Sequence, residues 1–253
     1  MRNIWIVSDT HLYHDNCLKF TRNDGTLMRP GFDNVQQMNE FILEKHNSVV
    51  KPGDLVYHLG DVVMGRPDGF VPFFNKFHGS KRLIVGNHDD IKWIAPLGIF
   101  QKITMWRKMP DFGLIMSHVP MHASSLSAKK PGDPLMLNVH GHIHHNRSPE
   151  GPYVNLCVEQ INYTPVHIDA IHALHKEQQK DYEPVLMEDF QPHDEFEMVS
   201  IRPKYDGMPP YFTDFDPDKK YSKLIYKPAQ SMVSTDLEDL IEAAQNRIKD
   251  KRI

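Results

Sequence analysis

The sequence predicts a layered domain of mixed α and β structure over residues 1–175, of the α/β (α+β) class. Three observations predict it. Short apolar runs alternate with amphipathic stretches in this part of the chain, and five of six apolar runs lead directly into clusters of polar residues. Hydrophobic residues make up 40% of the 253 residues, which is enough for a sizeable core.

The apolar runs have the length of strands, and the stretch between the first two has the spacing of a helix. The predicted strands are Asn3–Val7, Leu55–Leu59, Arg82–Val85, Gly113–Met116, Leu135–Val139 and Tyr153–Val158. A helix is expected from about Asp33 to His46, with Asp33 as its N-cap. Asp169 is expected to cap a second helix in the same way.

Residues 176–253 are predicted to form a C-terminal extension packed on the main domain. Seven prolines fall between Tyr182 and Pro228, with little periodicity, so we expect largely irregular structure there. Thr235 and Glu238 fit a capping box before an apolar helical pattern, which predicts a terminal helix near 235–250.

Composition excludes several classes of protein. The two cysteines, Cys17 and Cys157, cannot form a disulfide scaffold and suit a reducing cytoplasm. No apolar run approaches the roughly 18 residues of a membrane helix, and the N-terminus does not read as a signal peptide. Lys and Arg total 29 against 33 Asp and Glu, so the charge does not indicate a generic nucleic-acid binder. We therefore expect a cytoplasmic protein with no membrane contact.

Histidine is concentrated where the polar clusters lie: fifteen of the 16 histidines precede residue 176. This skew toward a good metal ligand predicts a metal site. The clusters that follow the predicted strands are Asp9-Thr10-His11, Gly60-Asp61, Gly86-Asn87-His88-Asp89, Ser117-His118 and Gly141-His142-Ile143-His144. Because loops that leave neighbouring strands meet at one rim of a sheet, we expect a single site.

The ligand types and their spacing suggest how metal would be held. Carboxylates, imidazoles and an amide oxygen, without cysteine, suit Mn²⁺, Fe or Zn²⁺. Residues that alternate on an extended segment, such as Asp9 and His11, are expected to project to the same side and deliver two ligands together. Asp61 stands alone after a glycine, as suits a carboxylate that bridges two cations.

All five motifs, in this order and over roughly residues 1–170, closely resemble those of the calcineurin-like metallophosphoesterases, in particular small bacterial and phage phosphoesterases. The resemblance implies a four-layer β-sandwich flanked by helices, with a dimetal site at the sheet edge. It implies His88 as the catalytic histidine. It also implies one metal on Asp9, His11, Asp61 and His144, and another on Asp61, Asn87, His118 and His142.

Two divalent cations about 3.5–4 Å apart generate a nucleophile at neutral pH and clamp the phosphate. Mn²⁺ is favoured, and the ligand set also admits Fe, Zn²⁺, Ni²⁺ or Mg²⁺. We expect attack by a metal-bridging hydroxide on the phosphate ester. His88 would protonate the leaving oxygen, and Asp89 would orient His88.

The expected substrates are small or nucleotide phosphodiesters, cyclic nucleotides included. A phosphomonoesterase and a non-catalytic binding or scaffold protein of the same fold are the alternatives. Residues 1–175 carry 17 basic and 16 acidic side chains, which disfavours long nucleic acids. The oligomeric state is not indicated.

Other polar residues carry weaker expectations. His58 is expected behind the ligands or in the core, because it lies within a predicted strand. The residues that we expect to line the substrate pocket or to contact phosphate are His14, Asn16, Arg66, His122 and His140.

Overall fold

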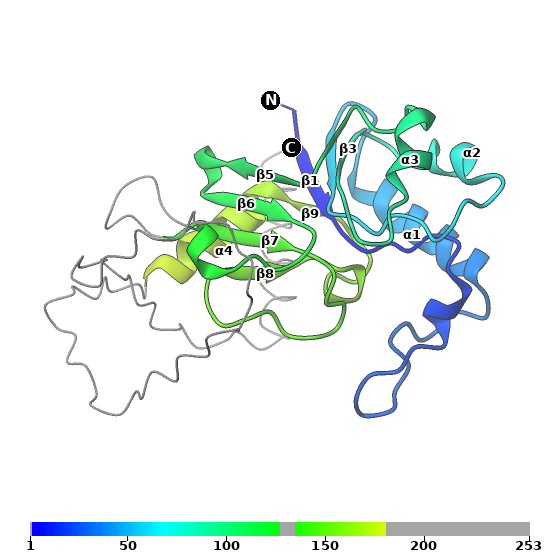
Figure 1. Cartoon of the computed structure of the whole chain (residues 1–253), viewed down its shortest axis with the longest axis horizontal. Coiled ribbons are helices and arrows are strands. Elements are labelled where there is room, and N and C mark those ends of the chain that lie inside the picture. Colours follow the sequence, from blue (N-terminus) through cyan, green and yellow to red (C-terminus); the bar gives the residue numbers. More distant parts are fainter. Residues whose placement is uncertain (1, 127–134, 181–253) are drawn as a thin grey trace, which may run out of the picture. The chain divides into compact units, whose positions relative to one another are not determined.

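The computed structural model describes residues 2–126 and 135–180. Most of the predicted extension, with the terminal helix near 235–250, lies outside the described residues. Within the described part, no helix is long and apolar enough to cross a membrane. Two sheets and a small number of helices make up this part of the chain (Figure 1).

The first sheet has five strands in the order β4-β3-β2-β1-β9. Four of them are parallel to their neighbours, and β9 is antiparallel to β1. The register pairs Ile4 with Leu55 and Leu55 with Ser80. The strands are β1 (Ile4–Val7), β2 (Leu55–His58), β3 (Ser80–Ile84), β4 (Lys102–Thr104) and β9 (Val166–His167).

The second sheet has four strands in the order β5-β6-β7-β8. β6, β7 and β8 are parallel, and β5 is antiparallel to β6. The strands are β5 (Trp106–Met109), β6 (Leu114–Ser117), β7 (Leu137–His140) and β8 (Tyr153–Asn155). The parallel strands matter for function because their carboxyl ends share one edge of the sheet.

The two sheets share one hydrophobic core, which makes the domain a sandwich. Ile6 and Ile84 of the first sheet and Leu114, Leu137 and Val139 of the second are all 0% exposed and belong to the same cluster. Alternation along each strand turns these residues inward and sends their neighbours to the outer faces. The predicted sandwich of mixed α and β structure is confirmed.

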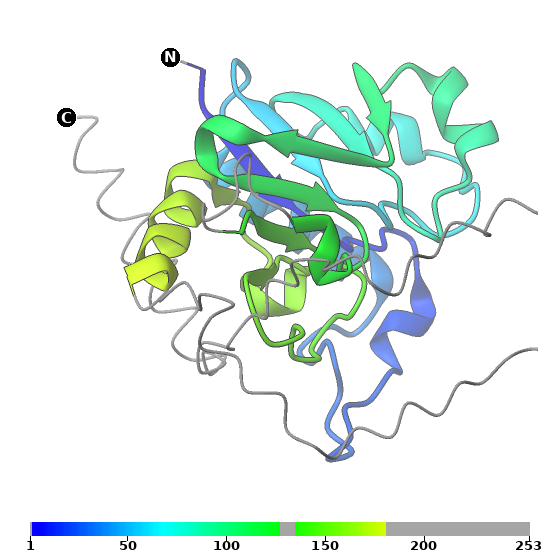
Figure 2. The same ribbon diagram turned by 60° about the vertical axis from the view of Figure 1, so that its left-hand side comes forward.

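Helices cover the outer face of the first sheet. In a second core cluster, α1 (Val35–Val49), α2 (Phe70–Phe74) and α3 (Ile91–Ile94) bury Met38, Phe70 and Ile94 with Leu83 of β3. α4 (Ile168–Lys180) follows β9 directly and packs on β1 and β9. Figure 2 shows α4 in yellow-green at the left of the view.

The outer face of the second sheet is covered differently. Ile115 and Tyr153 pack there with Leu126 and Met136 in a small separate cluster. Among the described residues, the helix at this cluster is the short 3-10 helix Ala123–Leu126.

The six predicted strands all exist, with shifted ends, but three strands and both caps were missed. β4 and β5 are partly exposed and contain lysine or arginine, and β9 has only two residues, so none of the three reads as an apolar run. Asn34, not Asp33, caps α1, because its side chain accepts a hydrogen bond from the Gln37 N–H at 2.9 Å. Asp169 lies inside the first turn of α4, and its N–H donates to the His167 ring.

Candidate metal centre

The predicted ligands come together where five strands end. They follow β1 (Asp9 and His11), β2 (Asp61), β3 (Asn87), β6 (His118) and β7 (His142 and His144). Their ligand-type atoms form two groups, Asp9 with His11 and His144, and Asp61 with His118 and His142.

The first group surrounds one point. His11 Nε2 lies 3.7 Å from Asp9 Oδ1 and 3.5 Å from Asp61 Oδ2. His144 Nε2 lies 3.9 Å from Asp9 Oδ1. Atoms that each sit about 2.1 Å from a common ion are separated by distances of this order.

The second group adjoins the first through Asp61. His118 Nε2 is 3.5 Å from Asp61 Oδ2, the same oxygen that faces His11. Asn87 Oδ1 lies 2.8 Å from His118 Nε2 and 2.9 Å from His142 Nδ1. The geometry therefore puts Asp61 where a carboxylate would serve both groups.

The donor set fits divalent metal ions. Asp9 Oδ1 and His11 Nε2 are buried with no hydrogen-bond partner, although leaving such atoms unpaired costs about 1–3 kcal/mol each. Burial opposes ionisation of Asp9, but His11, His118 and His144 together with the Ser8 hydroxyl outweigh it and lower the pKa of this carboxyl. An ionised, buried, unpaired oxygen beside imidazole nitrogens is the environment that a cation completes.

Backbone strain is concentrated at the same residues. Asp9, His11, Asp61, His142 and His144 have φ angles of 57°, 46°, 54°, 71° and 51°. Left-handed conformations are costly for residues with a Cβ, and they cluster at functional sites. Each pair of ligands is thus delivered by left-handed turns, and the expectation of extended segments is wrong.

Asp9 is oriented by its other oxygen. Oδ2 accepts hydrogen bonds from Ser8 Oγ at 2.5 Å, from the His142 N–H at 2.9 Å and from Cys157 Sγ at 3.2 Å. These three donors leave Oδ1 directed at His11 and His144. Burial raises the pKa of Cys157 well above its usual value, which keeps the thiol a donor.

Two glycines allow the loops to approach this closely. A Cβ on Gly60, whose φ is +101°, would lie 2.6 Å from the backbone of Gly86. A Cβ on Gly141 would overlap the side chains of Ser8 and Asp9. The small residue beside Asp61 therefore lets the backbones of two of these loops approach each other closely.

The comparisons with known proteins agree with this geometry. The family model described as calcineurin-like phosphoesterase matches residues 2–201. The chain belongs to this family. Membership makes the protein a phosphoester hydrolase of a kind that typically depends on two metal ions.

Two similar sequences and one solved structure extend this result. An uncharacterized protein of Methanocaldococcus jannaschii is 31% identical over 183 residues, which are 69% of this chain and 92% of that protein. The gene 66 protein of Mycobacterium phage L5 is 32% identical over 92 residues, 35% of this chain and 41% of that protein. The crystal structure of a protein of unknown function from Aquifex aeolicus superposes with a TM-score of 0.53 at 26% identity, and covers 69% of this chain and 100% of that one.

His88 lies on the exposed side of the predicted ligands. The residue is exposed, and its ring centroid is 5.5 Å from that of His11. Its backbone N–H donates to Asp61 Oδ1 at 2.9 Å, which fixes the loop relative to the shared carboxylate. The ring itself remains accessible to a substrate.

Asp89 has a different task from the one expected. Its two oxygens accept hydrogen bonds from the backbone N–H groups of Asp61, Val62 and Gly86 at 2.8–3.0 Å. Among the described contacts, none joins the Asp89 carboxylate to the His88 ring. Asp89 therefore organises the backbone that carries Asp61.

His58 lies behind the ligands, as the sequence predicted. It is 4% exposed, and burial lowers its pKa to about 3. Nε2 is 2.9 Å from the Thr10 hydroxyl, and Nδ1 accepts the Gly60 N–H at 3.2 Å. The neutral ring thus links two loops that carry ligands.

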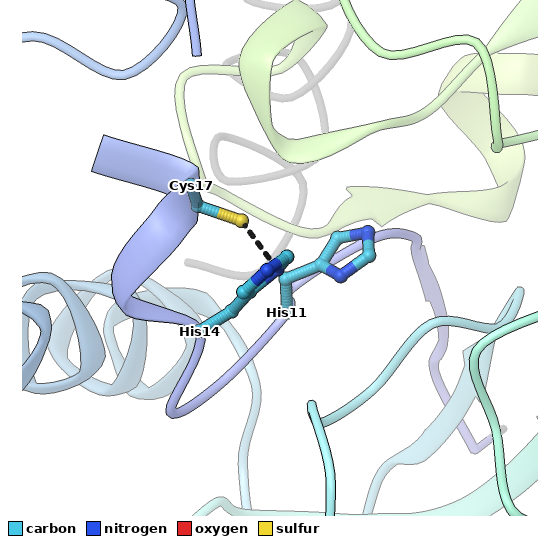
Figure 3. Close-up of side chains that lie close together, drawn as sticks. All are labelled: His11, His14 and Cys17. Atoms are coloured by element: carbon cyan, nitrogen blue, oxygen red, sulfur yellow. Dashed lines mark hydrogen bonds between the residues drawn. The ribbon is translucent and has the colours of Figure 1, made fainter. Parts of the chain in front are cut away.

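His14 is placed beside the centre by a thiol. Its Nδ1 lies 3.0 Å from Cys17 Sγ, and its ring lies 5.5 Å from the His11 ring. Figure 3 shows His14 between Cys17 and His11. Burial raises the pKa of Cys17 to about 11, so the thiol donates its proton to Nδ1. The other ring nitrogen is then an N–H donor.

The remaining expected substrate residues have other contacts. Asn16 is exposed and accepts from Lys19 at 3.4 Å. Arg66 forms an exposed ion pair with Asp90. His122 is exposed and bonds to Ser124 within its own turn.

His140 does not reach the substrate side. It is 0% exposed, and burial lowers its pKa to about 4. Both ring nitrogens are engaged, Nδ1 with the Gly141 carbonyl and Nε2 with Ser148 Oγ, each at 2.9 Å. The expectation that His140 contacts phosphate is wrong, because no ring nitrogen is free.

Sequence reasoning missed the residues behind the first group. Arg29, Asn155, Glu159 and Gln160 all contact the segments of Asp9 or His144. None belongs to a motif, and Arg29 and Glu159 are 130 residues apart. The signal available was a lone arginine in a loop, which usually denotes a solvated surface.

Proposed function

We propose that the chain is a dinuclear metal-dependent phosphodiesterase acting on small or nucleotide substrates. One metal ion would be held by Asp9, His11, Asp61 and His144. The other would be held by Asp61, Asn87, His118 and His142. The observation that carries this proposal is the set of buried, unpartnered ligand atoms, Asp9 Oδ1 and His11 Nε2, that face the shared Asp61.

The two ions would supply a hydroxide nucleophile at neutral pH and offset the charge of the phosphoryl oxygens. Mn²⁺ is the ion we propose, because the predicted ligands are imidazole, carboxylate and amide groups without a thiolate. Buried free thiols at Cys17 and Cys157 also support the proposed cytoplasmic location, where such groups stay reduced.

His88 would act on the leaving group. Its ring is exposed beside His11, and its backbone is fixed to Asp61, so it can hold a proton next to the reacting phosphate. Transfer of that proton to the departing oxygen avoids release of an alkoxide. Asp89 keeps the loop of Asp61 in place during this step.

His14 would bind the substrate. With Nδ1 accepting from Cys17, the Nε2–H is a neutral hydrogen-bond donor next to His11. It would donate to a phosphoryl oxygen or to the leaving group. Phe20, whose ring packs edge-on against His14, is 44% exposed and would contact an organic substituent.

The charges around the centre favour a diester over a monoester. A monoester carries a second negative charge, which active sites offset with cationic side chains. Two arginines contact the loops of the motifs in the described structure, and each is already paired, Arg29 with Glu159 and Arg66 with Asp90. A singly charged diester needs no further cation.

The test compares hydrolysis of bis-p-nitrophenyl phosphate with that of p-nitrophenyl phosphate, with added Mn²⁺, in the wild type and in His88→Ala. We expect faster turnover of the diester, lost in the variant although two metals remain bound. Preference for the monoester would make the protein a phosphatase. No turnover of either compound with two metals bound would make it a non-catalytic scaffold.

A further inference from the structure

Behind the first group of ligands lies a buried ion pair that the chemistry above does not use. Arg29 is 1% exposed as a residue, and the Glu159 side chain is also 1% exposed. Arg29 Nε and Nη2 each lie 2.7 Å from Glu159 Oε1. Buried charges are costly unless they are paired, so the pair calls for a physical explanation.

The pair contacts both chain segments that carry this group. Arg29 Nη2 donates to the Asp9 carbonyl at 2.6 Å, and Nη1 donates to the Thr10 carbonyl at 3.0 Å. Glu159 Oε1 accepts from His144 Nδ1 at 3.0 Å. One guanidinium and one carboxylate oxygen therefore link Asp9 to His144.

The contact with Glu159 decides which nitrogen of His144 faces the metal position. Because Nδ1 carries the proton that is donated to Glu159, the lone pair lies on Nε2, the nitrogen that faces Asp9 Oδ1. Two side chains from the same region hold the His144 carbonyl, Asn155 at 2.7 Å and Gln160 at 2.9 Å.

The hydrogen bonds behind the first group fall at residues with a strained backbone. Asp9 has a φ of 57° and His144 a φ of 51°, conformations that persist only where the surroundings impose them. Two hydrogen bonds from one rigid guanidinium to successive carbonyls would hold the turn at Asp9 in this form.

We infer that Arg29 and Glu159 are positioning residues that pre-form one of the two metal positions, the one made by Asp9, His11, Asp61 and His144, before any metal binds. The inference rests on the proposed function. It implies that this position owes its affinity to the buried pair, whereas the position at Asn87, His118 and His142 does not.

The test is calorimetric titration of metal-free protein with Mn²⁺, for the wild type and Glu159→Gln. The amide keeps the size of the side chain and removes its charge. We expect two sites in the wild type. In the variant, we expect one site with unchanged affinity and one weakened by about 10- to 100-fold. His144→Ala should remove the same site.

Asp54→Asn is the matched control. Asp54 is a buried carboxylate, 5% exposed, that accepts from Trp5 Nε1 at 2.9 Å and from Asn3 at 2.8 Å, before β2 begins and away from the ligands. This variant should be less stable yet bind two metals as the wild type does. A similar loss of one site in Asp54→Asn would show that Glu159 acts only through general stability and would overturn the inference.

A second variant covers the case in which Glu159→Gln does not fold. Glu159→Asp keeps the charge that Arg29 needs but is one methylene too short to reach both partners, so it should fold and still weaken one site. Two sites of wild-type affinity in a folded Glu159 variant would refute the inference while leaving the phosphodiesterase intact. Fewer than two sites in the wild type would instead refute the proposed dinuclear function.

Discussion

The two halves of the proposed metal centre are built from similar side chains but differ in their surroundings. Asp9 and His11 are 0% and 3% exposed, and the charged pair of Arg29 and Glu159 lies behind them. We call this the closed half, with His144. Asn87 and His142 are exposed, and with His118 they form the open half.

The halves also differ in what orients their histidines. His118 Nδ1 donates to the Leu59 carbonyl at 2.8 Å, a neutral acceptor, whereas His144 Nδ1 donates to a carboxylate. Burial would lower the pKa of His144, but the hydrogen bond and charge of Glu159 outweigh it and raise that pKa. Hydrogen bonds to charged groups are about twice as strong as neutral ones. The comparison predicts a tightly held closed half and an open half that faces substrate.

Removal of the shared ligand should have the largest effect, because it affects both halves. We expect Asp61→Asn to weaken both metal sites and to lower kcat/KM on the order of 10⁴-fold or more. Metal analysis and diester hydrolysis measure the two effects. Loss of activity with both metals fully bound would contradict the shared role of Asp61.

A variant of the open side should separate catalysis from metal binding. His88→Ala removes the proposed proton donor but no predicted ligand, so kcat should fall by about 10³-fold while two metals stay bound. The loss of kcat in His88→Ala should be smaller for a substrate whose leaving group has a low pKa, because such a group departs without being protonated. Equal losses for good and poor leaving groups would argue against proton donation by His88.

Acid should destabilise the closed half through Glu159. Burial raises the pKa of Glu159, but Arg29 and His144 outweigh it and bring the pKa to about 2, below its usual value of 4.5. Between these values the unfolded chain binds more protons, so the stabilisation is complete above pH 4.5 and is lost as the pH falls toward 2. The difference is about 3 kcal/mol in the free energy of unfolding.

Urea unfolding of the metal-free wild type and Glu159→Gln, each at several pH values, measures this difference. Subtracting one protein from the other cancels the contribution of buried histidines such as His58, which is common to both. A difference that does not change with pH would show that folding leaves the pKa of Glu159 unchanged and would refute this prediction.

Chelation should release the metals in order. The open half should lose its ion first, because Asn87 and His142 are exposed and this half lacks the charged pair, and the affinities should differ by about 10-fold or more. Titration with a chelator should then pass through a species with one metal per chain. His142→Ala, which removes a ligand of the open half, should hold one metal per chain without any chelator. Release of both ions in a single step would remove the distinction between the halves.

Local patterns in the sequence predicted six of the strands and the polar residues that gather where five of them end. A short apolar run followed by Asp, Asn or His can be read without knowing the fold, and this held for Asp9, Asp61 and Asn87 alike. The left-handed backbone conformations of Asp9 and His11 could not be predicted from the sequence, because neither residue is a glycine.

The residues that distinguish the halves could not be predicted from the sequence. Arg29 lies in a loop without periodicity, and Glu159 lies in the 3-10 helix Val158–Gln160, far along the chain. Only in the folded chain do the two side chains lie 2.7 Å apart. Because both are buried there, each charge is costly unless it is paired with the other. His14 and His140 could not be told apart from the sequence either, because each lies next to a motif. Only the structure shows that His140 is buried and His14 is not.

Substitution of Arg66 should have the smallest effect. Its guanidinium pairs with Asp90, and the two side chains are 60% and 36% exposed. Exposed pairs contribute about 0–1 kcal/mol, and Asp90 retains its bond to the Trp93 N–H without Arg66. Arg66→Ala should therefore change stability by less than about 1 kcal/mol and the KM for a small diester by less than about threefold. A larger rise in KM, matched by the rise that high salt causes in the wild type, would instead show that Arg66 binds the substrate through its charge. The open half would then include residues beyond its metal ligands.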